Sequence, residues 1–93
     1  MITPITPFPQ VTVYSKPGCG PCRALARFLE TRNIPCIVVD ITEDQAAADR
    51  LRALGHLSTP VTEVSGTLVA GFRPDRIAEL LEIPPSARPL GAA

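Results

Sequence analysis

The stretch QVTVYSKPGCGPC, residues 10–22, decides how this chain of 93 residues is expected to fold. Its first six residues alternate and are rich in β-branched side chains, which predicts a strand over 10–15. A short turn follows, and the helical spacing of apolar residues beyond it predicts a helix over about 21–32. Cys19 therefore lies in the turn between the predicted strand and the predicted helix, and Cys22 lies in the first turn of that helix.

A thiol at such a junction is expected to be reactive. Free N–H groups and the positive end of the helix dipole stabilise a thiolate, which is the nucleophilic form of cysteine. Cys19 lies just ahead of the helix, where it can be exposed, and Cys22 lies behind it in the first turn. The intervening Gly20 and Pro21 let the two sulfurs meet, and Lys16 adds positive charge nearby. We predict that Cys19 attacks a partner disulfide and that Cys22 resolves the resulting mixed disulfide.

The rest of the chain predicts three more strands and two more helices. The first is a strand over 36–40 that is expected to be buried on both faces. A helix capped by Thr42 and Gln45 follows, ends near Leu54 and is expected to turn Ala47, Leu51 and Leu54 inward. Strands over 61–64 and 67–70 are joined by Ser65-Gly66, and the last helix runs from Pro74 to about Leu81. Asn33 and Gly55 are expected to end the first two helices. Strands separated by helices run parallel, whereas a hairpin is antiparallel. The order β-α-β-α-β-β-α thus predicts an α/β fold with a four-stranded mixed sheet.

The composition is typical of one globular domain. The chain is 45% hydrophobic and 19% charged, and its nine Lys and Arg residues balance nine Asp and Glu residues. Such a balance gives no reason to expect a nucleic-acid or membrane partner, and neither a spanning segment nor a secretory signal is evident. We expect a cytoplasmic protein with an extended proline-containing arm over 1–9, a redox domain over 10–82 and a mobile Pro/Ala-rich tail over 83–93.

A zinc site is the second interpretation of the cysteine pair. Zinc would need two further ligands, and Cys36 and His56 are the only Cys and His residues left. Cys36 falls inside a predicted apolar strand, which is typical of a buried small residue, and His56 falls in a loop. We therefore favour a redox pair that uses no metal or other cofactor.

Thr59 and Pro60 precede the third predicted strand. Pro60 is either an ordinary strand-start residue or part of a cis peptide that faces the cysteine pair. We predict the cis form, which leaves the Thr59 backbone available to an extended substrate segment.

Taken together, these residues resemble the NrdH-type redoxins, in the glutaredoxin-like branch of the thioredoxin superfamily, over about residues 10–82. The segment that ends at Pro60 is similar to the cis-proline loop of that family. The string GFRPDRI, Gly71–Ile77, is similar to the loop that distinguishes NrdH redoxins from glutathione-using glutaredoxins. The resemblance implies a thioredoxin/glutaredoxin fold, reduction by thioredoxin reductase, and a client that is a class Ib ribonucleotide reductase or another disulfide-containing protein.

The resemblance also implies a surface that binds these partners. It comprises Lys16, Gly20, Pro21, Thr59, Pro60, Gly71, Phe72 and Arg73. Phe72 has an alternative role as a hydrophobic staple on Ile77. Two alternative functions remain: a glutaredoxin that uses glutathione or another low-molecular-weight thiol, and a non-catalytic module that holds an iron–sulfur cluster or a partner.

Overall fold

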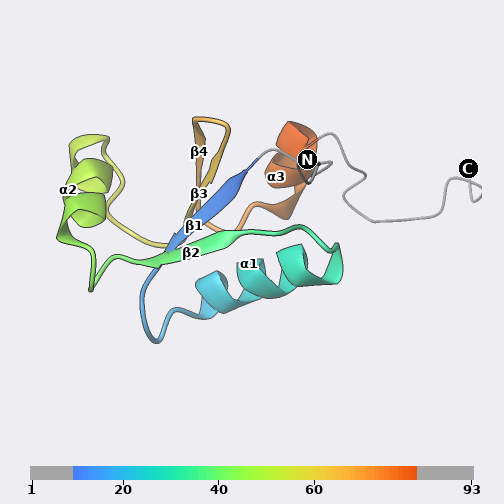
Figure 1. Ribbon diagram of the computed structural model, residues 1–93, viewed down its shortest axis with the longest axis horizontal. Helices are drawn as coiled ribbons and strands as arrows, with labels where there is room; N and C mark the ends of the chain where they lie inside the picture. The colour runs from blue at the N-terminus through green and yellow to red at the C-terminus, as the bar shows by residue number, and fades with distance from the viewer. Residues whose placement is uncertain (1–9, 82–93) are drawn as a thin grey trace, which may run out of the picture.

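The computed structural model describes residues 10–81, so the predicted arm over 1–9 and tail over 83–93 lie outside the described residues. The described part follows the predicted β-α-β-α-β-β-α order (Figure 1). Its elements are β1 (Val11–Ser15), α1 (Gly20–Thr31), β2 (Ile37–Asp40), α2 (Gln45–Ala53), β3 (Val61–Val64), β4 (Thr67–Ala70) and α3 (Pro74–Leu81). Among these residues, no helix has the length and apolarity that crossing a membrane requires.

The four strands form one mixed sheet in the order β2-β1-β3-β4. β1 is parallel to β2 and antiparallel to β3, and β3 is antiparallel to β4. This arrangement confirms the predicted thioredoxin/glutaredoxin class of fold. The register pairs Ser15 with Asp40, Tyr14 with Val61, and Val61 with Ala70. The last residues of β1, β2 and β4 therefore meet the first residue of β3 at one end of the sheet, which we call the cysteine end.

The helices divide between the two faces of the sheet. Alternate residues of a strand point to opposite faces, so Val11 and Val13 join one core cluster and Tyr14 joins the other. α1 and α3 supply Leu25, Phe28, Leu29, Ile77 and Leu81 to the first cluster. α2 supplies Leu51 to the second. α1 and α3 therefore cover the same face of the sheet, and α2 covers the other.

The ends of α1 and α2 follow the predicted glycine and asparagine signals. Asn33 adopts a φ of 57°, and the Ile34 N–H donates to the Leu29 carbonyl at 2.9 Å. Gly55 adopts a φ of 89°, and the next N–H along the chain donates back to Leu51 at 2.8 Å. Both arrangements satisfy carbonyls that a helix end would otherwise leave unpaired.

The prediction that strand 36–40 is buried on both faces is wrong. β2 is an edge strand, and its Ile37 and Val38 side chains are 49% and 56% exposed. An apolar run of this kind does not show whether a strand has neighbours on both sides, so it does not distinguish a central strand from an edge strand.

The predicted cap of α2 is also wrong. The N-cap is Asp44, whose carboxylate accepts from the Ala47 N–H at 3.0 Å. Thr42 instead donates its backbone N–H and its hydroxyl to the Asp40 carboxylate. Because the helix ends at Ala53, Leu54 falls in its C-cap and is 53% exposed rather than inward.

The β3–β4 hairpin has the predicted bounds. Ser65 and Gly66 have φ values of 49° and 89°, so both central residues of the turn are left-handed. This conformation matches the right-handed twist of the two strands and needs residues that tolerate positive φ.

Candidate active site

Cys19 is the N-cap residue of α1 at the cysteine end of the sheet. Its backbone is extended, so the helix begins at the next residue, and its Sγ accepts a hydrogen bond from the Cys22 N–H at 3.2 Å. Pro21 occupies the first turn, where a missing N–H costs no intrahelical bond. Cys19 and Cys22 form a disulfide, with their Cα atoms 5.2 Å apart. The helix start therefore gives the Cys19 sulfur a backbone donor aimed at it.

The disulfide is shielded from solvent. Cys19 is 8% exposed and Cys22 is 5% exposed, so Cys19 is only slightly the more accessible of the two. The hydroxyl of Thr59 lies 3.5 Å from the Cys19 Sγ and donates a hydrogen bond to it. Covalent pairing with Cys22 and this contact explain why Cys19 is less exposed than its position ahead of the helix suggested.

The predicted cis-proline loop lies beside the pair. The Thr59–Pro60 bond is cis, as predicted, and Pro60 is buried. The Gly71 N–H donates to the Pro60 carbonyl at 2.8 Å, which fixes the start of the β4–α3 loop against this proline. Gly71 has a φ of 81°, a conformation that strains any residue with a side chain.

Two predicted partner residues follow Gly71 in that loop. Phe72 is 42% exposed and belongs to neither core cluster, so a staple on Ile77 does not bury it. Arg73 is exposed and forms no ion pair within residues 10–81. Both side chains are therefore available to a partner that approaches the cis proline.

A groove of about 310 Å³ runs beside the disulfide between α1 and β2. Both cysteines line it, and so does Lys16, in agreement with the expectation that this lysine lies near the pair. The sequence did not indicate two other lining residues, Arg23 and Val38. The position of Arg23, directly after Cys22 in the helix, could have indicated that it lies near the pair. Val38 could not be found in this way, because its strand was predicted to be buried on both faces.

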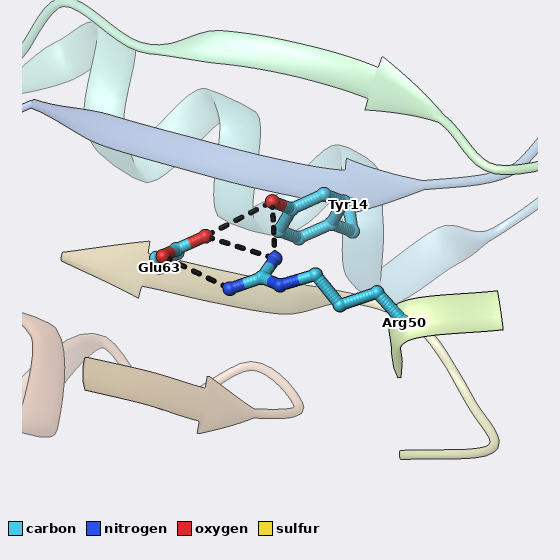
Figure 2. A network of polar contacts seen from close by, with 3 residues as sticks. All are labelled: Tyr14, Arg50 and Glu63. Carbon is cyan, nitrogen blue, oxygen red and sulfur yellow. Dashed lines mark hydrogen bonds and ion pairs between the residues drawn. The ribbon is translucent and has the colours of Figure 1, made fainter. Parts of the chain in front are cut away.

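A polar network on the opposite face of the sheet ties α2 to β1 and β3 (Figure 2). Arg50 donates to the Tyr14 hydroxyl at 2.9 Å and bonds both carboxylate oxygens of Glu63 at 3.2 and 3.3 Å. The Tyr14 hydroxyl in turn donates to Glu63 at 2.9 Å. Hydrogen bonds from Arg50 and Tyr14 lower the pKa of Glu63, whereas burial and then the Glu63 hydrogen bond raise the pKa of Tyr14.

The residues weighed as zinc ligands lie elsewhere in the structure. Cys36 is half-buried and packs against the α1–α3 core cluster, and burial raises the pKa of its thiol. His56 is half-buried just beyond the end of α2. Over residues 10–81, no three His, Cys, Asp or Glu side chains are grouped as metal ligands would be.

The fold and the cysteine pair define a thiol–disulfide oxidoreductase of the thioredoxin-fold class. The Glutaredoxin family model matches residues 11–69, which run from β1 into β4. The chain belongs to the glutaredoxin family.

Within that family the chain is similar to NrdH proteins. It is 35% identical over 77 residues to the glutaredoxin-like protein NrdH of Salmonella typhimurium, a match that covers 83% of this chain and 95% of that protein. The solved NrdH-redoxin of Escherichia coli superposes with a TM-score of 0.74 at 32% identity, covering 81% of this chain and 99% of the other. The thioredoxin-like protein BC3987 superposes with a TM-score of 0.70 at 35% identity, covering 76% and 99%. The chain is thus an NrdH-like redoxin with an intact cysteine pair.

Proposed function

We propose that this protein is a cytoplasmic electron carrier that thioredoxin reductase reduces and that in turn reduces a class Ib ribonucleotide reductase. The observation that carries the proposal is the position of Cys19 as the N-cap of α1, where the Cys22 N–H donates to its sulfur at 3.2 Å. A backbone donor and the positive end of a helix favour the thiolate over the thiol. The proposed redox domain spans residues 10–82.

In this proposal the electrons move in two exchange steps. The Cys19 thiolate attacks one sulfur of the client disulfide, forms a mixed disulfide and releases the other client sulfur as a thiolate. The Cys22 thiolate then attacks the Cys19 sulfur and releases the second client thiolate. The client gains two electrons, and the protein is left with the Cys19–Cys22 disulfide seen in the structure. Thioredoxin reductase would return two electrons from NADPH.

The surface that we propose for these partners surrounds the disulfide. It combines the turn and helix start at Lys16, Gly20 and Pro21 with the loops that carry Thr59, Pro60, Gly71, Phe72 and Arg73. The hydrogen bonds from Thr59 to Cys19 and from Gly71 to Pro60 support the placement of both loops at the site.

A reductase assay tests the proposal. The oxidised protein is mixed with purified thioredoxin reductase, NADPH and an oxidised class Ib ribonucleotide reductase, and NADPH consumption is followed. A parallel assay replaces thioredoxin reductase with glutathione and glutathione reductase, and a Cys19→Ser/Cys22→Ser variant gives the background. Turnover with thioredoxin reductase supports the proposal, whereas turnover with glutathione alone would identify a glutathione-dependent glutaredoxin instead.

A further inference from the structure

We infer that the groove between α1 and β2 binds an acidic peptide segment next to the client disulfide, so that the protein prefers disulfides flanked by Asp or Glu. The inference rests on the proposed function, because it names the class of substrate that the same cysteine pair would reduce. It comes from the charges, the walls and the position of the groove.

The groove carries two cations without an anion. Lys16 and Arg23 line it, and its lining includes no Asp or Glu. Within residues 10–81 neither cation forms an ion pair, whereas Arg50, Arg52 and Arg76 each pair with a carboxylate. Two exposed cations that share one groove are complementary to a carboxylate supplied by a bound partner.

The first turns of α1 add positive charge near the groove. Arg27 follows Arg23 by one helical turn, and the chain has no acidic residue between Lys16 and Glu30. Asp40 of the neighbouring strand is paired with Ser15, but it does not line the groove, and its carboxylate accepts hydrogen bonds from Thr42. The positive end of the α1 dipole lies at the same end of the helix. Lys16 and Arg23 thus place two positive charges beside the disulfide although the formal net charge of the chain is zero.

The walls of the groove suit an extended peptide rather than an isolated anion. Val13, Pro17, Ala26 and Val38 give it an apolar lining, and the Val38 side chain is 56% exposed. A volume of about 310 Å³ holds a short segment of peptide but not a folded domain. Because both cysteines line the groove, a segment bound there places its own disulfide close to them.

Two peptide disulfides of equal length test the inference, one flanked by Glu and the other by Gln. Protein reduced in advance with dithiothreitol is mixed with each peptide, and the second-order rate of reduction is measured. We expect the acidic peptide to react about three- to tenfold faster at low ionic strength, with the ratio shrinking as salt is added. Within any one variant both peptides react with the same Cys19 thiolate. A change in the reactivity of that thiolate therefore alters both rates equally and leaves their ratio unchanged.

Variants assign the preference to the groove. In Lys16→Gln/Arg23→Gln the ratio should fall close to one, whereas Arg52→Gln, which removes the same kind of charge from α2, should keep the wild-type ratio. Val38→Glu should lower the ratio by placing a carboxylate on the groove wall, and Val38→Gln should not. Because Val38 is exposed, both of its replacements are compatible with folding.

The outcomes separate this inference from the proposed function. If the wild-type protein reduces both peptides at equal rates, or if the preference survives in Lys16→Gln/Arg23→Gln, the inference is wrong and the proposed function stands. If the reduced wild-type protein reduces neither peptide, the proposed function fails and takes this inference with it.

Discussion

The hydroxyl of Thr59 lies 3.5 Å from the sulfur of Cys19, although 40 positions separate the two residues in the sequence. The contact joins the loop before β3 to the start of α1 at the cysteine end of the sheet. Together with the Cys22 N–H, it gives the Cys19 sulfur two hydrogen-bond donors. Donors aimed at a sulfur favour its charged form once the disulfide is opened.

Replacing Thr59 by Val should slow the attack of Cys19 at neutral pH. The change removes one donor and keeps the branched shape, and a hydrogen bond of about 0.5–1.5 kcal/mol corresponds to a rate lower by about two- to tenfold. The rate of alkylation by iodoacetamide, measured in a Cys22→Ser background, reports the effect. Thr59→Ser keeps the hydroxyl and serves as the control. An unchanged rate in Thr59→Val would mean that the contact does not assist the thiolate.

The two cysteines should differ in what their loss does. Cys19→Ser should abolish disulfide reduction, because the residue at the helix N-cap is the attacking one. Cys22→Ser should still attack and should accumulate a mixed disulfide with the client, since no second thiol resolves it. Mass spectrometry of the trapped complex distinguishes the variants. Sustained multiple turnover by either variant contradicts the assignment of roles.

Arg73→Ala should weaken coupling to the reductase without unfolding the protein. Arg73 is exposed beside Phe72 and has no ion pair within the described residues, so a partner is the expected recipient of its charge. We expect kcat/KM with thioredoxin reductase to fall about two- to fivefold at low salt, with the loss shrinking as salt rises. Arg52→Ala on α2 is the matched control. A sharp drop in Tm for Arg73→Ala, or unaltered turnover, would make this loop structural.

The parts of the fold and of the site that the sequence predicted are mostly those encoded by short signals. Cys19 and Cys22 share one turn of chain, and the β3–β4 hairpin follows from two turn residues at Ser65 and Gly66. The cis peptide at Pro60 did not follow from the dipeptide alone, which also fits an ordinary strand start, and it was the resemblance to a cis-proline loop that favoured it. The cysteine pair and the hairpin turn depend on neighbours in the sequence and so can be predicted from them.

The features that were missed depend on which elements meet in space. The apolar run of β2 fits a central strand as well as an edge strand, so the exposure of Val38, and with it the groove, did not follow from composition. The partners of the polar network are Tyr14, Arg50 and Glu63, which lie 13, 36 and 49 positions apart. The α2 cap failed for a different reason, because Thr42 and Asp44 are both good capping residues only two positions apart.

Glu63→Gln should lower the free energy of unfolding at neutral pH. It should also make that free energy fall less as the pH is lowered. Hydrogen bonds from Arg50 and Tyr14 lower the pKa of Glu63 below its ordinary value of 4.5. The ionised carboxylate therefore stabilises the fold above about pH 4.5, and this contribution is lost as the pH falls through the lowered pKa. Urea unfolding at neutral and acidic pH should show a loss of about 1 kcal/mol that is largest at neutral pH.

Glu79→Gln removes an exposed ion pair and should change stability by only a few tenths of a kcal/mol. Equal losses for Glu63→Gln at both pH values would argue against the ionised network.

Thr62→Val should stabilise the protein. Thr62 is fully buried opposite Val13, and its hydroxyl has no hydrogen-bond partner among residues 10–81. Removing an unsatisfied buried hydroxyl while keeping the branched side chain should add about 1 kcal/mol, or about 4–8 °C in Tm. Val13→Thr introduces a hydroxyl at the facing position and should lower Tm instead. A lower Tm for Thr62→Val would indicate that this hydroxyl is satisfied.

The antiparallel register of β1, β3 and β4 gives the domain two unequal poles. The cysteine end gathers Cys19, Thr59, Pro60 and Gly71, whereas the Ser65-Gly66 turn, beyond the Val64–Thr67 pair, closes the opposite end. Changes in the length or sequence of that turn act at the pole remote from the disulfide. The hairpin is therefore the natural place for this chain to vary, or to carry an inserted label, while its redox chemistry stays intact.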